Sequence, residues 1–204
     1  MSEKDTELRI KEAAKSIFIT QGYAGTRMQD IADLAEINKA LLHYYYRSKE
    51  RLYDVVFMEI FQELVNGLKS AFVEDVPVEE KIAVFIDHYI STLIENPHMP
   101  LFVVSEISRN PDAFIEKLKS KEHFSVANTM VLSFISDLNR QYGEDKNAIH
   151  LFINILSLCV FPFIAKPMLE ALTEMDKDTW KVLMETRKEE VKKFVFAALR
   201  NGER

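Results

Sequence analysis

The sequence has one cysteine in 204 residues, so the chain cannot form an internal disulfide framework. That cysteine, Cys159, lies in the apolar stretch 158–161, where the expected role is that of a small buried hydrophobe. The N-terminal residues are charged and hold no apolar signal core. Both features are typical of a reducing compartment, and we expect a cytoplasmic protein.

The sequence also has no uninterrupted apolar run long enough to span a bilayer. The longest one, 151–165, is interrupted by Asn154, Ser157 and Pro162 and is shorter than the roughly 18 residues that span a bilayer. We expect a buried core helix at this place and no membrane partner.

Glycine and proline are scarce, with five and six residues, whereas Leu, Ile, Phe, Glu and Lys are abundant. This composition favours long helices over strands and turns. Apolar residues make up 48% of the chain, which is enough for a sizeable core. The sequence therefore predicts an all-α protein of one or two domains.

Signatures of catalysis are absent from the sequence as well. There is no glycine-rich phosphate loop and no cysteine and histidine spacing typical of a metal site, and the five histidines do not pair at i, i+4. No nucleophile and base can be named. We expect that the protein is not an enzyme and that it uses no metal and no cofactor.

The net charge of −6 is unevenly distributed. Residues 1–53 hold nine basic and eight acidic side chains, and the remaining residues hold 17 and 24. Acidic charge thus lies away from the N-terminal segment, where Lys39, Arg47, Lys49 and Arg51 form a small basic patch. Such a segment stays compatible with a nucleic-acid partner.

Apolar spacing predicts three helices in the N-terminal segment. A period near 3.6 over residues 8–18 stops at Gly22, Thr26 is a candidate N-cap for a short second helix, and Asn38 is a candidate N-cap for a third. Two helices of about two turns, with three or four residues between them, have the proportions of a helix-turn-helix.

A much longer helix is predicted to start at Ser48. It carries apolar rows on two faces, so we expect it to join two domains, 1–53 and 54–204. Further helices are predicted over 77–96, 101–108, 112–142, from Asp145 to Pro162 or Pro167, and over 178–201.

Residues 8–52 contain a set of residue types at defined spacings. They are Ala13-Ala14, Phe18, Gly22-Tyr23, Thr26, Ile31-Ala32, Ala35, Ile37, Leu42, Tyr45 and Ser48-Lys49-Glu50-x-Leu52. This pattern resembles the TetR family of transcription regulators. The resemblance implies an N-terminal three-helix DNA-binding domain and a C-terminal helical domain for ligand binding and dimerisation. It also implies a sequence-specific regulator, commonly a repressor that a small hydrophobic or amphipathic effector releases from a palindromic operator.

Two residues depart from the family pattern. Glu36 stands where the family usually has Gly in the turn, and His43 stands where it usually has Tyr. If the turn requires a positive φ, a residue other than glycine costs about 1 kcal/mol there.

In a helix-turn-helix the third helix enters the major groove, and residues at helix starts suit phosphates. We expect Tyr46 to be core and Leu42 and Ile37 to pack on the first helix. The DNA contacts that the resemblance implies are Gln29, Asn38, Lys39, Ala40, Leu41, His43 and Tyr44 for bases, and Thr26, Arg27, Tyr45 and Lys49 for phosphates.

The C-terminal part is expected to bind a small-molecule effector and to form a homodimer through its last helices, which would place two reading helices on a near-palindromic double-stranded DNA operator. The effector pocket is expected among large apolar side chains, for which core packing is the ordinary alternative. The candidates are Phe61, Phe85, Tyr89, Phe102, Met130 and Phe152.

A rival hypothesis is a helical protein-interaction or lipid-carrying module that keeps a DNA-reading head without using it. The acidic C-terminal part and its apolar helices permit this function. The two hypotheses differ in behaviour, because a DNA reader loses affinity with salt and discriminates between sequences, whereas a carrier does neither.

Overall fold

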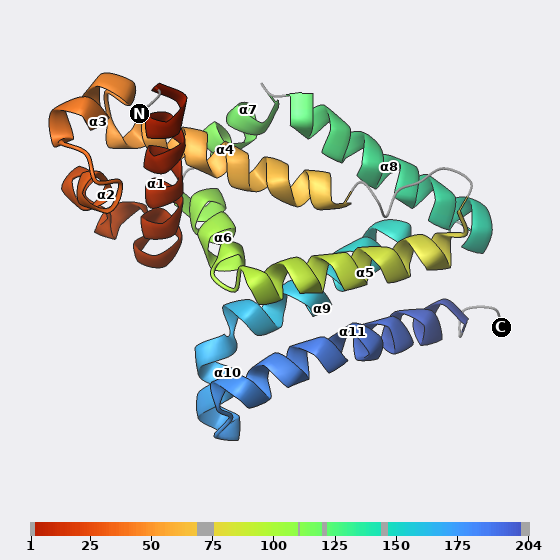
Figure 1. The fold of residues 1–204 in the computed structure, drawn as a ribbon. Coiled ribbons are helices and arrows are strands. Elements are labelled where there is room, and N and C mark those ends of the chain that lie inside the picture. The colour runs from red at the N-terminus through yellow and green to blue at the C-terminus, as the bar shows by residue number, and fades with distance from the viewer. Residues whose placement is uncertain (1–2, 69–75, 110, 120–121, 144–146, 201–204) are drawn as a thin grey trace. The chain divides into compact units, whose positions relative to one another are not determined.

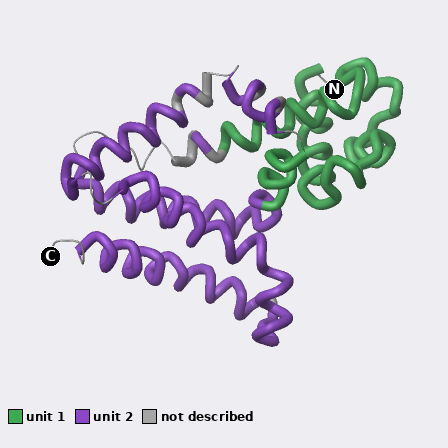
Figure 2. Tube along the Cα trace, turned by 180° about the vertical axis from the view of Figure 1, so that it is seen from behind, with its two compact units in different colours: residues 1–63, 101–110 green, residues 64–100, 111–204 purple. Residues whose placement is uncertain are grey.

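The structure is a computed structural model, and it describes residues 3–68, 76–109, 111–119, 122–143 and 147–200 (Figure 1). Within these ranges every regular element is a helix, which confirms the predicted all-α class. The chain forms two compact units (Figure 2). Unit 1 comprises residues 1–63 and 101–110, and unit 2 comprises 64–100 and 111–204.

Unit 1 contains the three predicted N-terminal helices. They are α1 (Glu3–Gly25), α2 (Met28–Leu34) and α3 (Lys39–Tyr45), followed by α4 (Lys49–Leu68) up to residue 63. Gly22 has a φ of 68°, a left-handed value that favours glycine, so the regular helix is interrupted where the apolar period ends. The core of this unit consists of fully buried aliphatic and aromatic side chains, among them Ile10, Ala14, Phe18, Ile31, Ala32, Leu42, Leu52 and Ile60.

A second stretch of the chain completes unit 1. Most of α6 (Met99–Arg109) belongs to it, although some 35 residues separate this helix from the end of the first stretch. Phe102 of α6 is buried against Tyr53 and Phe57 of α4, with ring centroids 5.4 and 5.7 Å apart. This aromatic contact holds α6 in the core of unit 1.

Unit 2 is a helical bundle with its own hydrophobic core. Its helices are α5 (Val78–Glu95), α7 (Pro111–Lys119), α8 (Glu122–Tyr142), α9 (Ala148–Ile164), α10 (Lys166–Thr173) and α11 (Lys177–Arg200). The core is built from α5, α8, α9 and α11, with residues such as Ile82, Ile86, Ile90, Leu138, Ile155, Cys159, Val191 and Val195. Burial raises the pKa of the Cys159 thiol to about 12, in agreement with its expected role as a small core residue.

Two predicted helices of unit 2 differ from the structure. The single helix predicted over 112–142 is two helices, α7 and α8. Pro162 does not end α9, which continues to Ile164, and Pro167 lies in the first turn of α10, where its missing N–H leaves no hydrogen bond unmade. The predicted helix start at Asp145 lies outside the described residues.

Among the described residues, no single helix is both long and apolar enough to cross a membrane. Only when taken together are the consecutive helices α9 and α10 long and apolar enough, and the chain bends by 68° at the break between them.

Candidate nucleic-acid interface

The start of α3 is fixed by a side-chain cap. Asn38 has an extended backbone, and its side-chain oxygen accepts a hydrogen bond from the Leu41 amide at 2.7 Å. This confirms Asn38 as the predicted N-cap. One turn further, Leu42 is fully buried in the core of unit 1, as expected. The cap and this buried anchor together determine which face of α3 is turned outward.

That outward face holds the side chains predicted to contact bases. Lys39, Ala40, His43 and Tyr44 are exposed, and Leu41 is half-buried. Tyr44 is 74% exposed, and its ring meets that of Tyr45 edge to face at 5.6 Å. An exposed tyrosine offers an apolar ring together with a polar hydroxyl, a combination that suits an interface.

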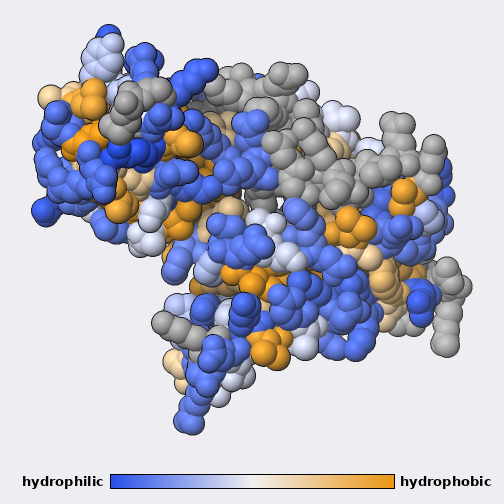
Figure 3. Space-filling view, viewed as in Figure 1, coloured by the Kyte–Doolittle hydropathy of each residue, from blue (hydrophilic) through white to orange (hydrophobic). Residues whose placement is uncertain are grey.

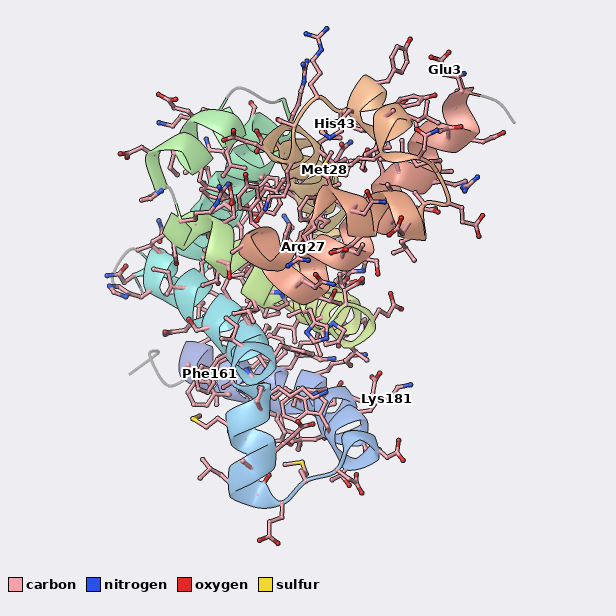
Figure 4. The ribbon with its side chains drawn as sticks, turned by 90° about the vertical axis from the view of Figure 1, so that its left-hand side faces the viewer. Glu3, Arg27, Met28, His43, Phe161 and Lys181 are labelled. Atoms are coloured by element: carbon pink, nitrogen blue, oxygen red, sulfur yellow. The ribbon has the colours of Figure 1, made fainter. Side chains whose placement is uncertain are left out.

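The preceding helix adds two more predicted contacts. On α2, Gln29 is exposed and its amide donates to Asp33 at 2.7 Å. Arg27 is exposed immediately before α2. Figure 4 looks onto the side of unit 1 that carries α2 and α3, where Arg27 and His43 are labelled. The two short helices therefore present basic and polar side chains from one helix-turn-helix.

The turn between α2 and α3 contains Glu36 at the position where the family pattern usually has glycine. Glu36 has a φ of 51°, so it lies in the left-handed region without being glycine. The side chain of Arg9, on α1, donates to the carbonyl oxygen of Ala35 and to Glu36 Oε2, the latter at 3.3 Å. The turn thus has a partner on α1 that the sequence pattern did not indicate.

Two predicted phosphate contacts have partners within the protein. Thr26 is not the N-cap of α2, because Arg27 occupies that position; the Thr26 hydroxyl instead donates to the Gly22 carbonyl at 2.7 Å, and the residue is buried. The prediction of Thr26 as N-cap was therefore wrong. Lys49 Nζ donates to the carbonyl oxygens of Tyr23 and Thr26 at 2.9 and 3.1 Å. This ammonium ties the start of α4 to the segment before α2.

The two remaining tyrosines of the run 44–46 are also placed. Tyr45 is half-buried, and its hydroxyl donates to the Glu3 carbonyl at 3.3 Å. Tyr46 is buried, which confirms its predicted core position, and its hydroxyl donates to Glu7 at 3.3 Å. Burial, together with the Glu7 carboxylate, raises the pKa of Tyr46 above its usual value.

Sequence reasoning missed a group of side chains that we call the Tyr23 cluster, which comprises Tyr23, Lys49, Tyr53, Glu106 and Arg109. Two cations lie over the Tyr23 ring, with Lys49 Nζ 4.3 Å and the Arg109 guanidinium 4.4 Å from its centroid. Arg109 pairs with Glu106 through two contacts, at 3.0 and 3.1 Å. No local pattern could have found this cluster, because α6 is remote in sequence from the other helices of unit 1.

The predicted effector residues are divided between the two units. In unit 2, the Phe85 ring lies 5.5 Å from that of Tyr89 and 6.4 Å from that of Phe152. Met130 is half-buried on α8. Phe61 and Phe102 belong to unit 1, where Phe102 is part of the core already described. The pocket itself stays a prediction.

Unit 2 has an apolar surface over its last helices. Phe161 of α9 and Phe194 of α11 are 56% and 62% exposed, and Leu183 is also exposed. Figure 3 shows apolar residues at the surface of this part of the molecule. A hollow of about 410 Å³ lies between α9 and α11, lined by Leu158, Arg187, Glu190, Val191, Lys193 and Phe194.

Comparisons with known proteins agree with this arrangement. Residues 10–56 match the model of the family described as "Bacterial regulatory proteins, tetR family". The HTH-type transcriptional repressor NicS of Pseudomonas putida is 26% identical over 165 residues, which are 76% of this chain and 74% of that protein. The HTH-type transcriptional regulator RutR of Escherichia coli is 44% identical over 66 residues, which are 32% of this chain and 31% of that protein. The chain therefore spans from about a third to three quarters of these curated relatives.

The fold of nearly the whole chain has a solved counterpart. A TetR transcription regulator from Haloarcula marismortui superposes with a TM-score of 0.68 at 21% identity, and the match covers 96% of this chain and 98% of that one. The helical fold is thus shared over nearly the whole chain, and the family model matches residues 10–56 within it.

Proposed function

The chain belongs to the TetR family of bacterial regulatory proteins, and we propose from this that it is a sequence-specific DNA-binding transcription regulator that represses from a palindromic operator until an effector binds. The observation that carries the proposal is the outward face of α3. A capped and anchored helix of seven residues presents Lys39, His43 and Tyr44 to solvent. This is the arrangement in which a helix-turn-helix places side chains against base edges in the major groove.

The chemistry of these side chains suits DNA. Lys39 can donate to guanine, and Ala40 and Leu41 can contact a thymine methyl group. Arg27, exposed before α2, can contact a phosphate and add salt-dependent affinity without sequence preference. Readout and positioning would thus come from neighbouring residues of one motif.

A homodimer is part of this proposal. Helix α11 buries Met184, Val191 and Val195 in the core of its own unit, yet it leaves Leu183 and Phe194 exposed. A helix that is apolar on two sides needs a second partner for the outer side. A second copy of the chain, packed through α9 and α11, would cover these residues and present two reading helices to a two-fold symmetric site.

The proposed effector is a small hydrophobic or amphipathic molecule bound in unit 2. Its binding must favour one conformation of the protein over another in order to change affinity for DNA. The chain passes from unit 1 to unit 2 within α4, and α6 begins in unit 2 and ends in unit 1. Movement of these two helices would carry the signal.

The first experiment captures sheared genomic DNA from the source organism with the purified protein and sequences what is retained. The test variant is Lys39→Ala/His43→Ala. The matched control is Lys119→Ala/His98→Ala, which removes the same side-chain types from exposed positions of unit 2. We expect the wild type and the control to enrich one palindromic sequence. We expect at least tenfold less enrichment by the test variant, since one good bidentate base contact contributes about 1–3 kcal/mol of discrimination.

The outcome also separates the rival function. A protein-interaction or lipid-carrying module would enrich no sequence in any variant, with or without apolar ligands, and its weak binding to DNA would not discriminate between duplexes. That result would refute the DNA-reading proposal. Equal operator affinity with and without a bound effector would refute the proposed release mechanism alone.

A further inference from the structure

The turn between α2 and α3 closes with a specific hydrogen-bond pattern. The amide of Ile37 donates to the Ala32 carbonyl at 3.0 Å, and the amide of Glu36 donates to the Asp33 carbonyl at 3.1 Å. These two bonds are those of a Schellman motif, whose left-handed residue is usually glycine because other side chains are strained there. Glu36 occupies this position with a φ of 51°. The turn before α3 therefore stores strain.

Arg9 is placed where it can hold this strained turn. Its guanidinium donates to the Ala35 carbonyl oxygen, which lies directly before the strained residue, and it also contacts the Glu36 carboxylate. Arg9 projects from α1 next to the fully buried Ile10, so it is anchored on the helix that forms the core of unit 1. One side chain thus fixes both the backbone and the side chain of the turn.

The ion pair between these residues is not the main part of this contact. The side chain of Glu36 is 85% exposed and that of Arg9 is 30% exposed, and exposed ion pairs contribute little to stability. Ala35, in contrast, is buried, and a buried carbonyl needs a hydrogen-bond donor. The contribution of Arg9 is therefore to the geometry of the backbone.

The position of α3 depends on this geometry, because the N-cap Asn38 follows Glu36 by two residues. We propose that Arg9 is a positioning residue for DNA reading, which holds the left-handed turn at Glu36 and thereby sets the angle at which α3 enters the groove. This inference rests on the proposed function. It adds a residue that lies outside the helix-turn-helix and makes no contact with bases.

The test measures binding to the enriched operator and to an unrelated duplex by fluorescence anisotropy at several salt concentrations. We expect Arg9→Ala to weaken operator binding about five- to tenfold, the equivalent of releasing one strained left-handed residue, while the affinity for the unrelated duplex changes less than twofold. Lys4→Ala, which removes a cation from an exposed position of the same helix, is the charge-matched control, and we expect it to leave the ratio of the two affinities unchanged.

Rescue by a second substitution distinguishes turn geometry from charge. Arg9→Ala/Glu36→Gly is expected to restore operator binding to within twofold of the wild type, because glycine adopts a φ of 51° without strain. Arg9→Ala/Glu36→Gln removes the same negative charge but keeps the strain, so it is expected to stay as weak as Arg9→Ala. If Arg9→Ala does not fold, Arg9→Lys, which keeps one donor but not the fork, replaces it in both pairs.

Several outcomes would overturn the proposal. One is that Arg9→Ala binds the operator as tightly as the wild type does. Another is that Arg9→Ala/Glu36→Gln restores operator binding as fully as Arg9→Ala/Glu36→Gly. If the slope of log affinity against log salt concentration is smaller in magnitude by about 0.9 for Arg9→Ala than for the wild type, Arg9 contacts a phosphate directly, which would also overturn the proposal. If the wild type itself enriches no operator, the proposed function fails, and that failure is seen before any Arg9 variant is compared.

Discussion

Substitution of Glu106 by Gln is the most direct test of how α6 is held in unit 1. The Glu106 side chain is 2% exposed and binds Arg109 through both carboxylate oxygens, and Arg109 lies over the rings of Tyr23 and Tyr53. Burial and then the neighbouring Glu106 carboxylate raise the pKa of Tyr53. Gln keeps the shape of the side chain but removes its charge.

The size of the effect follows from these contacts. A hydrogen bond to a charged group contributes about 1.5–3 kcal/mol, and a neutral one about 0.5–1.5 kcal/mol. Gln can accept only one of the two bonds from Arg109, but Arg109 is about one-third exposed and can recover part of its hydration. We expect Glu106→Gln to lower the free energy of unfolding of unit 1 by about 1–2 kcal/mol.

Hydrogen exchange followed by mass spectrometry measures this loss for each unit separately. We expect faster exchange in residues 3–63 and 101–109 and unchanged exchange in α11 of unit 2. Glu12→Gln, at an exposed position of α1, is the control and should change neither unit. A loss of less than about 0.5 kcal/mol in unit 1, or the same loss in unit 2, would refute the inference that the Tyr23 cluster helps to hold α6 in unit 1.

Three further predictions follow from single side chains. Asn38→Ala removes the N-cap of α3 and should lower the free energy of unfolding by about 1 kcal/mol in urea titrations, whereas Asn38→Asp, which keeps the acceptor, should change it little. Phe161→Asp places a charge on the apolar surface of α9 and should shift the sedimentation of the protein to that of a monomer, and an unchanged dimer would contradict the proposed interface. Cys159, with a pKa of about 12 and no exposed surface, should resist iodoacetamide up to pH 9 in the folded protein and react once urea unfolds it; rapid labelling of the folded state would contradict its burial.

Local sequence signals predicted the elements of unit 1 well. The Asn38 cap, the buried Leu42 and the start of α4 after Ser48 all depend on residues within one or two turns of each other. Apolar periodicity and capping act at this short range, so a single sequence displays them. The exposed face of α3 follows from the same signals, because the buried residue determines the opposite side.

Contacts between distant residues were not predictable in the same way. Arg9 lies 26 residues before its carbonyl partner, and Arg109 lies far along the chain from the Tyr23 ring that it covers. Packing in three dimensions decides such contacts, and a list of residue types does not contain it. The Thr26 prediction failed for a different, local reason: its hydroxyl donates to the Gly22 carbonyl four residues earlier instead of capping α2.

Unit 1 consists of two stretches of chain, and this bears on its synthesis and its transfer between proteins. A ribosome that has synthesised the first 63 residues must add 46 more before α6 is complete, a delay of about 2–9 seconds at about 5–20 residues per second. During that time the surface that Phe102 later covers on Tyr53 and Phe57 is open to chaperones. A hybrid regulator made by joining residues 1–63 to another sensor would keep this surface open permanently, so the graft should carry residues 101–109 with it.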